Sequence, residues 1–287
     1  MNLPGLTSFT KSPNGLAQLH IHTPLAKALI HPYGAHIAEY QPTGAEPVLF
    51  VSANSNFEKG KPIRGGVPII FPWFGPRENA PLHGLVRTAD WELESLTSDD
   101  GQTVEAVLKL SSSEATRAFW PHDFNLRLLV TVGAKLTVTL EVENTSSDSF
   151  QFEEAFHTYF TVGNIHDTTV TGLSDATYID KQDGFQRKLR DTSPVTFTAE
   201  TEEFYVDTTA TCEVIDPSLD RKIVVGKSGS ATTVVWNPWI AKAAAMPDFG
   251  DDEWKSMVCV ETANAGENLL TLAPGEIHQM TAEISVA

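Results

Sequence analysis

His157 lies in a stretch, FQFEEAFHTYFTVG at 150–163, in which aromatic and polar residues alternate. Strand side chains point alternately to opposite faces, so Phe156 and Phe160 belong to an apolar face and His157 to a polar one. An imidazole titrates near neutral pH and can donate or accept a proton, which makes His157 a candidate acid or base. The alternative is a half-exposed strand with a solvated histidine. Taken alone, the strand favours that alternative.

Glu261 is the residue least expected from its neighbours. It lies in MVCVET at 257–262, where alternation places it on one strand face with Met257 and Cys259. A carboxylate among apolar side chains is costly unless it is paired or catalytic. The alternatives are an edge strand, where Glu261 would meet water, and a structural pair with an arginine. A histidine and a partly buried glutamate on separate strands point to general acid–base chemistry.

A third segment, IRGGVPIIFPWFGPRENAPLHGLVR at 63–87, combines cations with flat apolar side chains. Its glycines and prolines demand special backbone angles, so we expect an ordered, irregular connection. Arg64 and Arg87 flank it and His83 lies inside, while its aromatic residues offer surfaces that can stack on sugar rings. A guanidinium forms two parallel hydrogen bonds to a phosphate. The alternative is a buried loop whose arginines bind carbonyl groups.

Other kinds of chemistry find little support in the sequence. No serine lies in a G-x-S-x-G motif, no cysteine–histidine pair stands out, and no phosphate loop of the GxxxxGK[ST] form is present. His20 and His22 would share a strand face, but no third ligand follows at a spacing typical of zinc sites. Cys212 and Cys259 lie in strand-like runs, where we expect small buried side chains. We therefore expect neither a metal nor a covalent nucleophile.

The charge of the chain narrows its partners. Its 287 residues include 20 Lys and Arg against 37 Asp and Glu, a formal net charge of −17. Nucleic acids and anionic membranes are bound through basic surfaces, so neither is an expected partner, and an anionic substrate would need a local cationic pocket. The sequence shows no signal peptide and no window long enough to span a membrane. We expect a monomeric cytoplasmic protein.

The elements that must position these residues are strands. Helix is indicated only at 113–119, with Ser113 as N-cap, and as a single turn at 251–255. Many short strands with little helix predict an all-β protein, a large antiparallel sandwich in one domain over 1–287. Besides 150–163, the expected strands are 19–22, 35–40, 91–96, 104–111, 124–132, 136–142, 168–171, 195–198, 211–215, 222–225, 232–236, 257–262, 269–272 and 278–286.

Taken in chain order, these segments resemble the aldose 1-epimerase (galactose mutarotase-like) superfamily, most closely its hexose-6-phosphate branch, the glucose-6-phosphate 1-epimerases. The resemblance implies a β super-sandwich without cofactor or metal. It also implies a small sugar phosphate as partner, with interconversion of the α and β anomers of an aldohexose 6-phosphate. The motifs that carry it are RGGVPIIFPWFGP at 64–76, HGLVR at 83–87, SSEATRAFWPHDF at 112–124, FHTYFTVGNI at 156–165, TGLSDATYIDK at 171–181, ETEEFYVDT at 200–208, WNPW at 236–239 and VCVETA at 258–263.

The resemblance also implies roles for individual residues. In that family the histidine of the HTYF-like motif is the general acid and the glutamate of the CVET-like motif is the general base. Here these are His157, expected as imidazolium, and Glu261, expected as carboxylate. The arginines that open RGGVP and close HGLVR bind the substrate, which implies this role for Arg64 and Arg87, with His83 beside them.

The chain departs from the family at 202–203, where relatives often have an Asp-Arg pair. Glu202 can replace the aspartate as an acceptor for a sugar hydroxyl. Glu203 reverses the charge of the arginine, which would weaken or move a phosphate contact. Two alternative functions stay open: a mutarotase for unphosphorylated aldoses, and a non-catalytic sandwich that binds carbohydrate.

Overall fold

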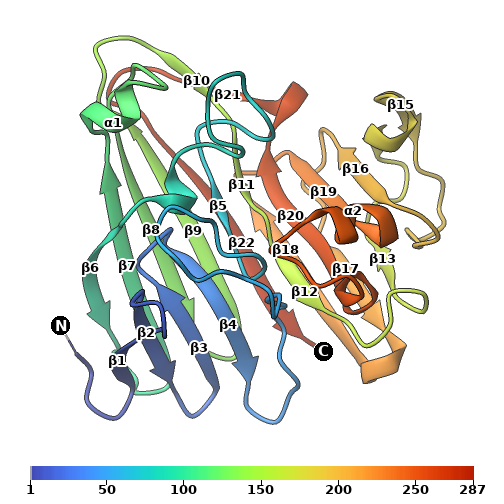
Figure 1. Cartoon of the computed structure of the whole chain (residues 1–287), viewed down its shortest axis with the longest axis horizontal. Coiled ribbons are helices and arrows are strands. Elements are labelled where there is room, and N and C mark those ends of the chain that lie inside the picture. The colour runs from blue at the N-terminus through green and yellow to red at the C-terminus, as the bar shows by residue number, and fades with distance from the viewer. Residues whose placement is uncertain (1) are drawn as a thin grey trace.

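Antiparallel strands dominate the computed structural model, which describes residues 2–287 (Figure 1). Two sheets contain eight strands each, and we call them the site sheet and the back sheet. The site sheet runs in the order β15 (Gln186–Leu189), β14 (Thr177–Asp180), β16 (Thr201–Tyr205), β19 (Thr232–Asn237), β20 (Met257–Asn264), β11 (Glu154–Phe156) and β5 (Ile69–Ile70), with β12 (Tyr159–Thr161) also paired to β20.

The back sheet has longer and more regular strands. Its order is β13 (Thr169–Thr171), β17 (Cys212–Asp216), β18 (Arg221–Ser228), β22 (Ile277–Val286), β9 (Leu136–Asn144), β8 (Phe124–Val132), β7 (Val104–Ser111) and β6 (Glu92–Thr97). In β8 and β9 every second residue is buried, as their alternating sequences predict.

Two smaller sheets and a few helical turns complete the described chain. The four-stranded sheet lies over the β6–β9 part of the back sheet in Figure 1, and its β3 contacts β8. Its strands are β1 (Thr7–Lys11), β2 (Ala17–His22), β3 (Ala26–His31) and β4 (His36–Pro42), while β10 (Phe150–Phe152) pairs with β21 (Leu270–Leu272). The helices are α1 (Glu114–Arg117) and α2 (Trp239–Ala245), with 3₁₀ turns η1 (Val86–Thr88), η2 (Lys181–Asp183), η3 (Pro217–Leu219), η4 (Glu253–Ser256) and η5 (Gly266–Asn268).

The predicted all-β antiparallel sandwich is confirmed, and so is the short helix after Ser113. The Ser113 side chain accepts a hydrogen bond from the backbone N–H of Thr116, which closes a capping box. Both cysteines are buried and free, as expected. Between residues 2 and 287 no helix is both long and apolar enough to cross a membrane.

Two predicted strands are corrected by the structure. The stretch 150–163 is not one strand but three, because β10 pairs with β21 whereas β11 and β12 pair with β20. The chain therefore leaves one sheet and enters another within this stretch. The predicted strand 195–198 is reduced to a single bridge between Val195 and Val170. Pro194, which comes directly before it, has no N–H to continue a ladder.

The irregular loop 63–87 is anchored in the core through Phe71. The Phe71 ring packs against Phe124 and Phe152, with ring centroids 5.1 and 5.5 Å away. Its carbonyl accepts a hydrogen bond from the backbone of Leu85 at 2.8 Å. Gly84 has a φ of +77°, and a Cβ there would lie 2.0 Å from that carbonyl oxygen. The glycine of HGLVR is thus required by this close backbone contact.

A buried ion pair joins the two large sheets. Glu154 in β11 is fully buried, and its Oε1 lies 2.9 Å from Nε2 of His278 in β22. Asn264 in β20 donates to the same carboxylate at 2.8 Å. Burial opposes the charged imidazole, but the carboxylate outweighs it and raises the pKa of His278. The pair therefore fixes β22 against the strand that leads to His157.

His31 and His36 are two buried histidines that contribute to the dependence of stability on pH. Both are buried, and burial lowers the pKa of His31 to about 4 and that of His36 to about 3. Below about pH 6.5 the unfolded chain therefore binds more protons than the native state. We expect their stabilising contribution to be complete above about pH 6.5 and to fall by roughly 2 kcal/mol per histidine at about pH 5. Urea unfolding across this pH range measures it.

A matched pair of variants tests the assignment. His36→Gln should remove about half of the loss expected from these two histidines, whereas His22→Gln, at an exposed position of β2, should leave the pH dependence unchanged. A slope that His36→Gln does not alter would show that burial of His36 does not contribute to the acid sensitivity.

Candidate active site

Glu261 lies in β20, an interior strand of the site sheet. This strand is hydrogen-bonded to β19 on one side and to β11 and β12 on the other, and all of its residues are buried. The exposed fraction of Glu261 is 1%. Both alternatives for this residue are wrong, because the strand is not at an edge and the group at ion-pair distance is His157 rather than an arginine.

His157 lies at the junction between β11 and β12. Its backbone N–H donates to the carbonyl of Pro68 at 3.0 Å, so the loop 63–87 holds this junction in place. The predicted apolar face is confirmed, since Phe156 and Phe160 are fully buried. On the opposite face Gln151 is exposed, but His157 is not solvated, because only 9% of it is exposed. The alternative of a half-exposed strand with a solvated histidine is therefore wrong.

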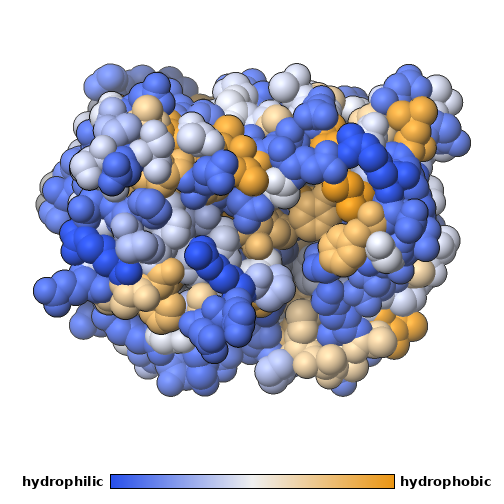
Figure 2. Space-filling view, turned by 90° about the horizontal axis from the view of Figure 1, so that it is seen from above, coloured by the Kyte–Doolittle hydropathy of each residue, from blue (hydrophilic) through white to orange (hydrophobic). Residues whose placement is uncertain are grey.

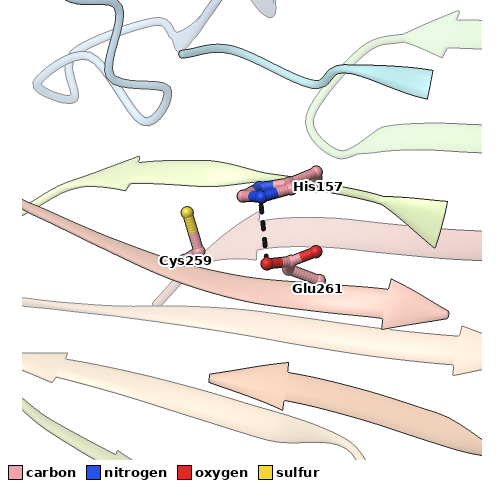
Figure 3. A group of neighbouring side chains, drawn as sticks. All are labelled: His157, Cys259 and Glu261. Atoms are coloured by element: carbon pink, nitrogen blue, oxygen red, sulfur yellow. Dashed lines mark ion pairs between the residues drawn. The ribbon is translucent and has the colours of Figure 1, made fainter. Parts of the chain in front are cut away.

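The side chains of His157 and Glu261 point toward each other, and Nδ1 of one lies 3.4 Å from Oε1 of the other (Figure 3). Burial lowers the pKa of His157 to about 3, and the nearby Arg64 and Arg87 add to this effect. Burial also raises the pKa of Glu261 well above its ordinary value, helped by Glu202. The structure thus favours a neutral imidazole beside a protonated carboxyl, the reverse of the expected charges. Either arrangement holds one transferable proton.

Both side chains line a cavity of about 300 Å³, at the small end of the range for sites that bind small molecules. Figure 2 shows a largely hydrophilic face of the molecule on which apolar side chains gather around a hollow. The cavity combines proton-transfer groups, cations and flat apolar walls. Its lining residues are Arg64, Phe74, Gly75, Pro76, Leu82, His83, His157, Tyr159, Lys181, Glu202, Trp236, Lys242, Met246 and Glu261.

Arg64 is held in the cavity wall by two partners. Its Nε and Nη2 lie 3.2 and 3.1 Å from Oδ2 of Asp248, and its Nη1 donates to the Tyr159 hydroxyl at 3.2 Å. Burial opposes the charged guanidinium, but these two partners outweigh it and raise the pKa of Arg64. The Tyr159 ring stacks on His157 with centroids 5.0 Å apart. Arg64 is therefore a fixed positive charge on the His157 side of the cavity.

His83 lines the cavity beside His157, with ring centroids 5.4 Å apart. The backbone N–H of Gly75 donates to His83 Nδ1 at 3.1 Å. Burial lowers the pKa of His83 well below its ordinary value, and nearby His157 and the cations add to this effect. The neutral ring must then carry its proton on Nε2, because Nδ1 is used as an acceptor. His83 thus offers one hydrogen-bond donor.

Arg87 does not line the cavity, unlike the other five residues expected at the site. Its Nη2 donates to the carbonyl of Leu82 at 2.7 Å. Burial lowers its pKa to about 10, and the neighbouring Arg64 adds to this effect. Binding of substrate by Arg87 therefore stays a prediction. Its contact with Leu82 fits the alternative for this loop, an arginine that binds a carbonyl group. Its positive charge also helps to lower the pKa of His157 and His83.

Glu202 and Glu203 point to opposite sides of β16. Glu202 lines the cavity and pairs with Lys181, and its Oε2 lies 3.3 Å from Nζ of Lys242. Glu203 pairs instead with Arg190, with Oε2 2.5 Å from Nη2. The charge reversal at 203 therefore faces away from the cavity and places no carboxylate against a bound anion. Two lysines bring positive charge to the same wall.

Several cavity residues were missed, although the quoted motifs contain some of them. Tyr159 lies in FHTYFTVGNI, Trp236 opens WNPW, and Lys181 ends TGLSDATYIDK. Lys242 lies on α2, a helix that the sequence analysis did not anticipate. Asp248 does not line the cavity but holds Arg64, and it follows α2 in an irregular connection where periodicity gives no signal. A reading of every polar residue in each motif would have found the first three.

The overall fold places the chain in a known structural class. A solved structure from Salmonella typhimurium, described as a candidate mutarotase, superposes with a TM-score of 0.93 at 34% identity and covers 100% of this chain and 95% of that one. The protein therefore has a mutarotase-like fold.

Sequence comparison then gives the family. The model of the family described as aldose 1-epimerase matches residues 18–285. A relative from Escherichia coli (strain K12), named as a candidate glucose-6-phosphate 1-epimerase, is 39% identical over 246 residues, 85% of this chain and 82% of its own. One from Cenchrus ciliaris with the same name is 35% identical over 93% of this chain and 83% of its own. The chain belongs to the aldose 1-epimerase family.

The anchor of Arg64 can be tested by stability. Removing Asp248 with Asp248→Ala leaves a largely buried guanidinium without its carboxylate, so we expect the free energy of unfolding to fall by about 1.5–3 kcal/mol. Asp90→Ala is the matched control, because it breaks an exposed pair with Lys59 whose side chains are 65% and 68% exposed. We expect less than about 1 kcal/mol there. Equal losses in urea unfolding would contradict the role of Asp248.

Proposed function

We propose that this protein interconverts the α and β anomers of an aldohexose 6-phosphate, with glucose 6-phosphate as the preferred substrate. The observation that carries the proposal is the convergence of His157 and Glu261, 3.4 Å apart, at the inner end of a cavity that also holds Arg64. Anomer exchange requires the ring to open and close, with one proton removed and one supplied. A facing acid and base meet that requirement.

The proton steps follow from the sugar. Glu261 as carboxylate accepts the proton of the anomeric hydroxyl, while His157 as imidazolium donates a proton to the ring oxygen. The C1–O5 bond breaks, the aldehyde end rotates, and the ring closes on the other face with the roles reversed. The pair holds one proton throughout. The negative charge of the substrate phosphate favours the imidazolium and so offsets the lowered pKa of His157.

The geometry of a pyranose determines which groups of the sugar face each side of the cavity. C6 is attached beside the ring oxygen, so a phosphate on C6 belongs on the side of the acid. Arg64 lies on that side through its contact with Tyr159, which stacks on His157. The three guanidinium N–H groups already described leave two more of its five donors for phosphate oxygens. His83 supplies a further neutral donor on this wall.

Glu202 serves the opposite side, near the base. Both carboxyls line the cavity, and the charge of Glu202 adds to the effect of burial in raising the pKa of Glu261. We assign Glu202 the binding of sugar hydroxyls, with Lys181 and Lys242 holding its carboxylate and presenting their remaining N–H groups. Trp236 lines the same cavity and offers a flat apolar face to the ring.

The other candidate functions fit the site less well. An enzyme for unphosphorylated aldoses would not need Arg64, whose charge is set firmly by Asp248 and Tyr159. A sandwich that only binds carbohydrate would not need a carboxyl buried against an imidazole, which is costly to fold. Action as a monomer in the cytoplasm stays a prediction from the sequence.

Removal of either proton-transfer group should abolish most of the activity. We expect His157→Asn and Glu261→Gln each to lower kcat for glucose 6-phosphate anomerisation by about 10²–10⁴-fold, since each keeps the shape but loses the proton function. Polarimetry or exchange NMR measures the rate, and His22→Asn on exposed β2 serves as the control. A wild-type protein that does not accelerate anomerisation would refute the proposal.

The phosphate contact predicts a change in preference rather than a general loss. Arg64→Met should lower kcat/KM for glucose 6-phosphate about 10–100-fold more than for glucose, because only the first substrate loses a charge-assisted pair. Lys255→Met is the control, since Lys255 pairs with Asp252 on the surface and does not line the cavity. Equal losses for both sugars would place the phosphate elsewhere.

A further inference from the structure

The acid–base pair has unused hydrogen-bonding capacity. Nδ1 of His157 and Oε2 of Glu261 are both buried and have no hydrogen-bond partner. His157 is 9% exposed and Glu261 is 1% exposed, so these atoms are shielded from bulk water. Buried polar atoms normally have a partner, so two that lack one next to each other indicate a place for a ligand.

Cys259 adds a third donor to these two. It lies two residues before Glu261 on β20, and the two side chains project on the same side of the strand, facing His157 from the neighbouring segment (Figure 3). The ligand atoms of the three residues all lie within 4.8 Å of one another. Among residues 2–287, no other group of three or more His, Cys, Asp or Glu side chains was found with its ligand atoms this close together.

We propose that His157, Cys259 and Glu261 form a site for a thiophilic divalent cation such as Zn²⁺, and that occupation of this site inhibits the enzyme. The inhibitory part rests on the proposed function, while the binding part stands without it. The cation would not be a cofactor. It would compete with the sugar for the same imidazole and carboxylate.

The spacing of the ligands suits a small tetrahedral ion. With Zn–N and Zn–O bonds of about 2.1 Å, the edge of a tetrahedron is about 3.4 Å. Nδ1 of His157 and Oε1 of Glu261 are 3.4 Å apart, so these two atoms already stand at that edge length. Because a Zn–S bond is about 2.3 Å long, the sulfur must lie slightly farther from the other two ligand atoms than they lie from each other. Rotation of the Cys259 side chain about χ1 can adjust these distances.

The mixed donor set selects among cations. One thiolate, one imidazole and one carboxylate suit Zn²⁺ or Co²⁺, whereas Mg²⁺ and Ca²⁺ prefer oxygen ligands alone. Binding uses the Nδ1 lone pair of the neutral imidazole and releases two protons to solvent, one from the Cys259 thiol and one from the Glu261 carboxyl. With three protein ligands, the fourth position of a tetrahedron stays open to water. Neither residue of the pair can then exchange a proton with a sugar.

Optical titration with Co²⁺ tests the site without using activity. The intact metal-free protein should develop a thiolate-to-cobalt charge-transfer band, and Zn²⁺ should displace Co²⁺, because it binds more tightly to such ligands. Cys259→Ser should abolish the band. Cys212→Ser is the matched control, because Cys212 is the other buried free cysteine, and it should keep the band. No band in the wild type, or loss of the band in Cys212→Ser instead, would overturn the proposal.

Activity assays test the inhibitory part. Zn²⁺ should slow glucose 6-phosphate anomerisation in competition with the sugar, and EDTA should restore the rate. Cys259→Ser should raise the Zn²⁺ concentration for half-inhibition by more than about tenfold. Full activity with the cobalt or zinc site filled would overturn inhibition. If the wild type anomerises no sugar, the proposed function fails, yet the cobalt band still decides whether the site exists.

Discussion

The burial of Glu261 inside the site sheet is the constraint on which the rest of the structure depends. A carboxyl group in this position loses its hydration, and the neighbouring backbone groups are already engaged in the ladder between β19, β20 and β12. The structure meets this cost with an imidazole at 3.4 Å and a shift of both groups toward their neutral forms. Because water is excluded, the local dielectric is low, and the charge of a bound anion acts more strongly on His157 and Glu261.

The positive side chains that line the cavity are paired with carboxylates, so they do not give the cavity a large net positive charge. Arg64 faces Asp248, and Lys181 and Lys242 share Glu202, so these lining cations already have carboxylate partners. In a chain with a formal charge of −17, such an arrangement gives little long-range attraction for an anion. Recognition must then depend on directed hydrogen bonds at short range. Arg87, held on a carbonyl behind the wall, adds positive potential without a direct contact.

Alternation predicted the strands of the back sheet, whereas β1, β3 and the site-sheet strands β14, β15 and β16 were not expected. Glu261 stood out because it conflicts with its apolar neighbours, and a conflict of this kind is local in sequence. His157 lies among polar neighbours, and its role as an acid came from the resemblance to the family. The partners of Arg64 and Glu202 could not be predicted in the same way, because Asp248 and Lys242 come from α2 and the connection after it, brought in by tertiary contacts. The direction of the Arg87 side chain could not be predicted for the same reason. Its type suggested phosphate, but its direction was fixed by the backbone of Leu82.

The two parts of the cavity are built from different kinds of structure. Its inner end comes from hydrogen-bonded strands, whose register a substitution cannot shift without moving a whole sheet. Its rim comes from three separate connections, the loop 63–87, η2 and α2. Descendants of a common ancestor could therefore exchange rim residues and acquire new sugars while inheriting the proton-transfer pair. When such relatives are compared, shared residues at the inner end indicate a shared reaction, and shared residues at the rim indicate a shared substrate.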